Sequence, residues 1–146
     1  MSMVHDPGVY ESLRKRIQAL RPDSQRKWGR MTVDQMLWHV NVSLAECVGE
    51  YTPPTMRAPI PRKLLRWLLL NVPWPKGSRT RPDMLVSQHY DFPVEHARCL
   101  RLLDRVHSRD LDASWPNSAS LGEMRGKHWS RLEAKHLEHH LTQFGV

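Results

Sequence analysis

Two histidines near the end of the chain, His136 and His140, are the residues whose type and spacing point most directly to chemistry. In an α-helix, residues four apart lie one turn apart on the same face. Trp129 and Phe144 fall in the same stripe of the helix predicted over residues 125–144, so this face is apolar. Both imidazoles are therefore expected to point toward the protein core.

Buried imidazoles are unfavourable unless their nitrogens find polar partners. A divalent metal is one such partner, because neutral imidazole is the commonest metal ligand and the H-x-x-x-H spacing lets one helix offer two. A pair of buried histidines hydrogen-bonded without a metal is the other interpretation. A metal site would need a third ligand, and another part of the chain must supply it.

The elements that would position such a site can be predicted from apolar residues that recur three and four positions apart. Asp6 and Pro7 are suited to begin a first helix, and Thr32 with Gln35 forms a capping box for a second. No stretch shows the alternation of a strand. The chain is therefore predicted to be all-α, a four-helix bundle in a single domain over residues 1–146, with helices expected at 7–20, 32–49, 91–108 and 125–144 and an additional short helix at 62–70.

His39 belongs to the second predicted helix and is the candidate for a third ligand, because metal sites in bundles form between facing helices. It lies about 120° from the centre of that helix's apolar stripe, as the helical repeat places it. From this geometry alone, a structural or solvated histidine is the more common case.

The long connecting loops carry most of the prolines. Residues 71–90 contain Pro73, Pro75, Gly77 and Pro82, which interrupt any periodic pattern. A loop of this length in a small domain is either functional or disordered. Its apolar residues indicate that it packs on the domain, where it could act as a lid: Trp74, Met84, Leu85 and Val86.

The composition excludes several classes of protein. The formal charge of +7 is spread over four basic clusters without a helix-turn-helix or zinc-finger pattern, so a solvated surface is favoured over nucleic-acid binding. An anionic small-molecule substrate is compatible with this charge. No apolar run is long enough for a membrane span, and the first residues lack a signal core, so a cytoplasmic protein is expected. Cys47 and Cys99 lie on core stripes and are expected to be buried, reduced thiols.

Two stretches resemble the DinB-like superfamily, in a branch classed as a domain of unknown function. They are WGRMTVDQMLWHV at residues 28–40 and KHLEHHLTQFGV at residues 135–146. Members tend to read W-G-x-M-T-x-x-Q-M-L-x-H near the start and K-H-L-x-H-H-L-x-Q-F-G at the end. The middle of the chain, PWPKGSRTRPDMLV followed by DFPVEHARCLRLL, is similar in kind, so the resemblance covers about residues 9–146.

The resemblance implies a four-helix bundle that binds a divalent metal through three histidines, which match His39, His136 and His140. Zinc or nickel would suit three imidazoles, while iron and manganese stay open. His139 matches the second histidine of the family's H-H pair and is expected beside the site or at the surface. Gln143 lies close to the His136–His140 face and is the first candidate to orient the ligand rings. Glu46 and Glu133 are further candidates.

One departure from the family pattern concerns the start of the last helix. Relatives often have Thr-x-Glu-Glu-Trp, whereas this chain has Arg125-Gly-Lys-His-Trp129. The helix dipole disfavours cations at an N-terminus, by roughly 0.3–1 kcal/mol each. A frayed first turn or a bound anion is expected there.

Three histidines leave a coordination position open, as in catalytic sites. Characterised relatives include thiol S-transferases and isomerases that use low-molecular-weight thiols. The resemblance thus implies a metal-dependent thiol S-transferase or small hydrolase, with Arg57, Arg62 and Arg79 as candidates to meet a thiol's carboxylates and no catalytic residue assigned. The alternative is a non-catalytic metal-binding bundle with an interaction role, for example as a homodimer.

Overall fold

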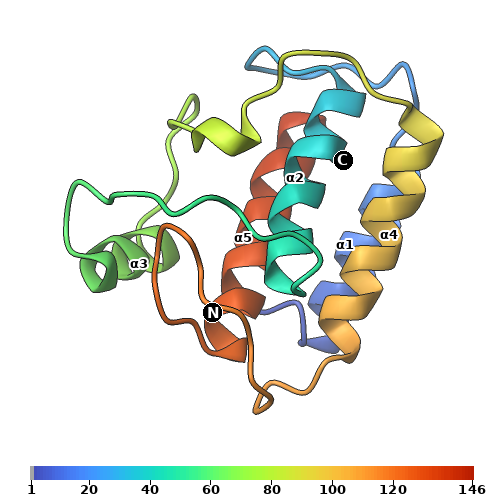
Figure 1. Ribbon diagram of the computed structural model, residues 1–146. Coiled ribbons are helices and arrows are strands. Elements are labelled where there is room, and N and C mark those ends of the chain that lie inside the picture. The colour runs from blue at the N-terminus through green and yellow to red at the C-terminus, as the bar shows by residue number, and fades with distance from the viewer. Residues whose placement is uncertain (1) are drawn as a thin grey trace.

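The computed structural model describes residues 2–146, and this part of the chain forms five α-helices and no β-strand (Figure 1). The predicted all-α class is therefore confirmed. A short 3-10 helix, η1, and an isolated bridge between Ser118 and Gly122 complete the regular structure. The elements are α1 (Pro7–Ala19), α2 (Val33–Cys47), α3 (Arg62–Asn71), η1 (Pro82–Met84), α4 (Phe92–Ser108) and α5 (Gly126–Gln143).

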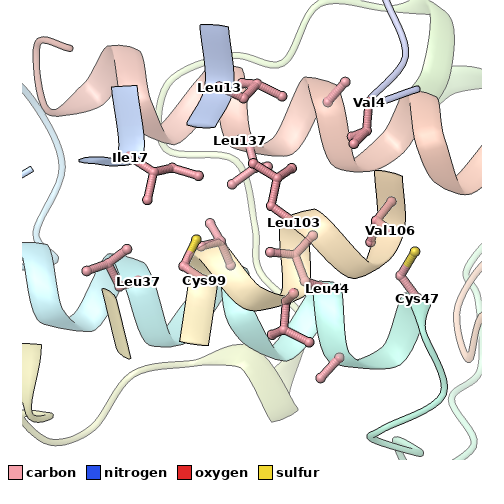
Figure 2. Close-up of a cluster of buried hydrophobic side chains, with 14 of the residues drawn as sticks. Val4, Leu13, Ile17, Leu37, Leu44, Cys47, Cys99, Leu103, Val106 and Leu137 are labelled. Atoms are coloured by element: carbon pink, nitrogen blue, oxygen red, sulfur yellow. The ribbon is translucent and has the colours of Figure 1, made fainter. Parts of the chain in front are cut away.

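Four of these helices pack side by side around a common core. The most extensive contact is between α2 and α4, and α1 lies against both α4 and α5 (Figure 1). Each helix contributes buried apolar side chains to the core (Figure 2), among them Ile17, Leu44, Leu103 and Leu137. The short helix α3 stands outside this group and packs against α5. α5 therefore contacts the other helices of the bundle as well as α3.

The ends of the helices follow mostly from local hydrogen bonds. Gln35 accepts a hydrogen bond from the Thr32 amide at 2.9 Å, which is one half of the predicted capping box. Asp6 does precede α1, but its side chain makes no cap. It accepts instead from the amide of Met3 at 2.9 Å. Asp6 is therefore the N-cap residue followed by proline, as predicted, but it lacks the side-chain hydrogen bond that such a residue usually makes.

The start of α5 also differs from the expectation. The Arg125 amide donates to Nδ1 of His128 at 3.1 Å, so a histidine occupies the acceptor position that an acid takes in a capping box. Burial, followed by the charges of nearby cations, lowers the pKa of His128 and favours the neutral ring that can accept. The helix is formed from Gly126 onward, so its first turn is not frayed, while the bound anion stays a prediction.

The loop between α3 and α4 packs on the domain, as predicted. Met84 is buried, and the indole of Trp74 donates to the Leu69 carbonyl at 2.9 Å. Leu85, however, is 59% exposed, so its inclusion among the packing residues was wrong.

Cys47 and Cys99 are free and buried, as expected, and burial raises the pKa of Cys99 to about 12. None of the helices in residues 2–146 combines the length and apolar character needed to cross a bilayer.

The contrast between Leu103 and Leu85 provides a test of the core. Leu103 is fully buried between the helices, whereas Leu85 is largely exposed. We expect Leu103→Ala to lower the free energy of unfolding by about 2–5 kcal/mol, since it removes buried methyl groups and leaves a cavity. Leu85→Ala should change it by no more than about 0.5 kcal/mol. Urea denaturation of both variants measures the difference, and equal losses would contradict this packing.

Candidate metal centre

The structure brings together the three histidines that the sequence singled out. His39 on α2 and His136 and His140 on α5 are all buried, and each offers one ring nitrogen within 4.8 Å of the others. Nε2 of His39 lies 3.0 Å from Nε2 of His136. The rings meet edge to face, with centroids 4.8–5.0 Å apart. This group of three histidines is called the histidine cluster below.

His39 is buried because α2 is covered on nearly all of its sides. The helix packs on α4 and α5, and η1 lies across the remaining side. Met84 of η1 accepts a hydrogen bond from Nδ1 of His39 at 3.1 Å. The long loop therefore buries His39, which would otherwise lie at the exposed edge of the apolar face of α2. The stripe geometry alone, which favoured a structural or solvated role for His39, could not include this covering segment.

His140 is held by a chain of two hydrogen bonds. Its Nδ1 donates to Oε1 of Gln143 at 2.8 Å, and Nε2 of Gln143 donates to the Trp28 carbonyl at 3.0 Å. Gly29 makes room for this amide. A Cβ at Gly29 would lie 2.4 Å from Nε2 of Gln143, and its φ of +85° also favours glycine. Gln143 therefore lies where the sequence suggested, in contact with a cluster ring.

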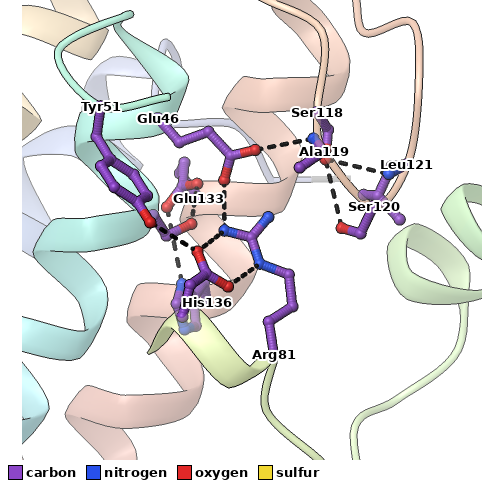
Figure 3. Close-up of polar contacts among 11 residues, drawn as sticks. Glu46, Tyr51, Arg81, Ser118, Ala119, Ser120, Leu121, Glu133 and His136 are labelled. Atoms are coloured by element: carbon purple, nitrogen blue, oxygen red, sulfur yellow. Dashed lines mark hydrogen bonds and ion pairs between the residues drawn. The ribbon is translucent and has the colours of Figure 1, made fainter. Parts of the chain in front are cut away.

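The ring of His136 faces a buried carboxylate on its other side (Figure 3). Nδ1 of His136 lies 3.8 Å from Oε2 of Glu133, and Ser43 donates to the other carboxylate oxygen at 2.6 Å. Oε2 has no hydrogen-bond partner among the residues described. Glu133 is completely buried, and this burial raises the pKa of its carboxyl to about 7.

These contacts define which nitrogens are free. A carbonyl oxygen can only accept, so Nδ1 of His39 must carry its proton, and the Gln143 amide imposes the same on His140. In the neutral rings of His39 and His140, the lone pairs therefore lie on the nitrogens that face the histidine cluster. Nε2 of His136 lies 3.0 Å from the lone pair on Nε2 of His39 and donates to it in the metal-free protein. Burial is the main cause that lowers the pKa of His39 to about 3, of His136 to about 4 and of His140 to about 2. Three neutral imidazoles with converging nitrogens fit a divalent metal ion, which would take the place of the proton on Nε2 of His136.

The other residues suggested by the sequence lie around the cluster rather than in it. His139 packs edge to face against Trp28 and Trp74, beside the ring of His140. Glu46 accepts from the Ala119 amide and pairs with Arg81, so it does not orient a cluster ring. Of the three arginines proposed for a thiol, Arg79 lines the cavity described next, and Arg57 and Arg62 are not among its described lining residues.

A cavity of about 450 Å³ opens beside the histidine cluster. Its volume is in the range of small-molecule sites. One wall is apolar and consists of Leu65, Leu68, Leu69 and Trp74. Arg81, which the sequence analysis did not single out, and Met84 lie further along the loop that carries Trp74 and also line the cavity. No spacing pattern distinguished Arg81 from the rest of the loop.

Comparisons with protein-family models, with curated proteins and with solved structures give no match to this chain. The description of the site therefore depends on its geometry and on the chemistry of its side chains.

The buried histidines predict how the stability of the metal-free protein depends on pH. In the unfolded chain the rings gain protons near their ordinary pKa of 6.5, whereas the folded rings stay neutral until about 3, 4 and 2. Stability is therefore present above pH 6.5 and is lost as the pH falls below it, by about 1.4 kcal/mol per pH unit for each proton. Arg81 and His139 face the rings and act in the same direction. The raised pKa of Glu133 has the opposite effect on the pH dependence of stability. It involves one proton, whereas the three rings together involve three.

Urea denaturation between pH 5 and 7 measures this dependence in chelator-treated protein. His140→Leu should show a shallower fall of the unfolding free energy than the natural chain, because one buried ring has been removed. The same pH dependence in both proteins would contradict the burial of this ring.

Proposed function

We propose that this protein is a divalent-metal-binding helical bundle of the DinB-like type that acts as a metal-dependent enzyme on a small molecule. The convergence of three buried neutral imidazoles beside a cavity carries the proposal. The packing of α1, α2, α4 and α5 supports the four-helix bundle implied by the family resemblance. The family assignment is part of the same proposal and is supported by the two end motifs.

His39, His136 and His140 would hold the metal through the nitrogens that face one another, and their outer nitrogens are already oriented. Met84 and Gln143 fix the rings of His39 and His140, and Glu133 faces His136. Such outer contacts set the tautomer and direction of ligand rings. A divalent metal in this setting supplies Lewis acidity and lowers the pKa of a bound water or thiol. Zinc or nickel is the proposed ion, with iron or manganese as the further candidates.

The reaction that fits these features is thiol S-transfer or a small hydrolysis. The apolar wall contributed by α3 and Trp74 would bind the body of a substrate and exclude water from the metal's open side. A low-molecular-weight thiol is the proposed co-substrate, by resemblance to characterised members of the superfamily. Neither cysteine of the chain can act as the nucleophile, because both thiols are buried and burial raises their pKa.

An alternative function is association, with a structural metal or none. The observation in its favour is on α3, where Leu64 and Trp67 are 48% and 57% exposed and lie one turn apart. Such a face could pair with a second copy of the chain. Sedimentation of the natural chain and of Trp67→Glu separates this function from the enzyme, since only a dimer would respond to the variant.

Elemental analysis of protein made without a polyhistidine tag tests the metal site. We expect about one equivalent of divalent metal in the natural chain. The double variant His136→Ala/His140→Ala should lose it while keeping its helical circular dichroism, because two of the three ligands are gone. Less than stoichiometric metal after reloading, or equal metal in both proteins, would overturn the proposal.

The Gln143 contact predicts a graded effect on metal affinity. Gln143→Leu keeps the apolar volume but leaves Nδ1 of His140 without its acceptor. Loss of such a contact lowers metal affinity by roughly 10- to 100-fold. Gly29→Ala should act in the same direction from outside the site, because its Cβ would displace the Gln143 amide. Gly77→Ala is the matched control, since its φ of +78° is also positive and a Cβ there meets no atom within 4 Å. Competition with a chelating dye measures the three affinities, and an unchanged value for Gln143→Leu would refute the orienting role.

A further inference from the structure

Arg81 is held at the wall of the cavity by two carboxylates (Figure 3). Its Nη2 lies 2.8 Å from Oε2 of Glu46 and 2.9 Å from Oδ2 of Asp83, and its Nε donates to Oδ1 of Asp83 at 3.1 Å. Glu46 is fixed in turn by the Ala119 amide, and Asp83 accepts from the hydroxyl of Tyr51 at 3.2 Å. The guanidinium therefore cannot turn freely.

The third nitrogen of this guanidinium, Nη1, has no partner among residues 2–146. Figure 3 shows two nitrogens of Arg81 with dashed lines and the third without one. The side chain is 17% exposed, and the residue lines the same cavity as the histidine cluster. The charge of Arg81 also contributes to the lowered pKa of His136, which reflects its proximity to that ring. A fixed donor pair on Nη1 is thus available to a ligand in the cavity.

The charges around Arg81 decide which ligand it can receive. Glu46 and Asp83 together carry one negative charge more than Arg81 carries positive charge, so this triad alone would not attract an anion. A divalent ion on three neutral imidazoles reverses the sign of the local charge. Guanidinium groups bind carboxylates well because their N–H donors match the carboxylate oxygens. Across the cavity, the wall formed by Leu65, Leu68, Leu69 and Trp74 suits an apolar group.

We propose that the cavity binds a small carboxylic acid with an apolar body, whose carboxylate accepts from Nη1 of Arg81 and whose body packs against α3 and Trp74. The inference rests on the proposed function, since the metal's charge is needed to offset the two acids. Arg81 is thereby a specificity-determining residue. It selects an anionic over a neutral ligand of the same shape.

Calorimetric titration of the metal-loaded protein with 3-phenylpropanoate and with its uncharged analogue 3-phenylpropanamide tests the proposal. In the natural chain the carboxylate should bind at least tenfold more tightly than the amide. Arg81→Lys keeps a cation for Glu46 and Asp83 but removes Nη1, so the preference should fall to about twofold. Arg14→Gln removes an arginine that pairs with Asp104 outside the cavity, and it should retain the preference. Equal binding of the two probes, or a full preference in Arg81→Lys, would overturn the proposal.

A second variant tests the competing charge beside Arg81, while retention of the preference in Arg81→Lys would indicate direct capture of the carboxylate by the metal. Asp83→Asn removes one competing negative charge while leaving an oxygen to accept from Arg81, so carboxylate affinity should rise severalfold. A loss of folding cannot produce such a gain, and an unchanged affinity would contradict the role of Arg81. Metal content is measured on every sample. Protein that holds metal but does not prefer the carboxylate refutes this inference alone, whereas protein that holds no metal refutes the proposed function.

Discussion

The main constraint on this fold is the burial of three neutral imidazoles whose inner nitrogens converge. Burying polar nitrogens is unfavourable unless each has a partner. The outer nitrogens of His39 and His140 find theirs in Met84 and Gln143, which belong to the long loop and to α5. The inner nitrogens face only one another. The surrounding elements are therefore arranged to orient the rings, and a metal ion would satisfy all three inner nitrogens together.

The loop between α3 and α4 depends on the same arrangement. It is tied to α2 near both ends of that helix: Asp34 accepts from the Tyr90 amide at 2.8 Å, and Glu46 pairs with Arg81 at 2.8 Å. Between these ties, Met84 covers His39. A lid motion of the whole segment would have to break all three contacts at once. The part free of them is 72–80, which carries Trp74 and Arg79 on the cavity side. The lid predicted for residues 71–90 stays a prediction, and a motion confined to residues 72–80 would leave these three contacts intact.

The sequence predicts the helices well because their caps and apolar spacings are local. The Thr32–Gln35 cap and the His136–His140 pair are visible as short patterns, and both are found as expected. The burial of His39 is not local, since it depends on η1, some 45 residues away in the chain. Arg81 could not be identified for the same reason. Its role follows from Glu46 on another element, and no periodicity connects the two. Tertiary contacts made by loops cannot be predicted from the local patterns of a single sequence.

The unpaired oxygen of Glu133 links the fold to the metal. Oε2 is buried, lacks a hydrogen-bond partner among the described residues and lies 3.8 Å from Nδ1 of His136. An unsatisfied buried acceptor destabilises a protein by roughly 1–3 kcal/mol. If Nε2 of His136 binds a cation, its proton must reside on Nδ1, where it points toward this oxygen. The metal would thereby supply Glu133 with a donor, and Glu133 would orient His136. Each feature is costly alone, and together they explain why a fully buried acid lies beside a buried histidine in α5.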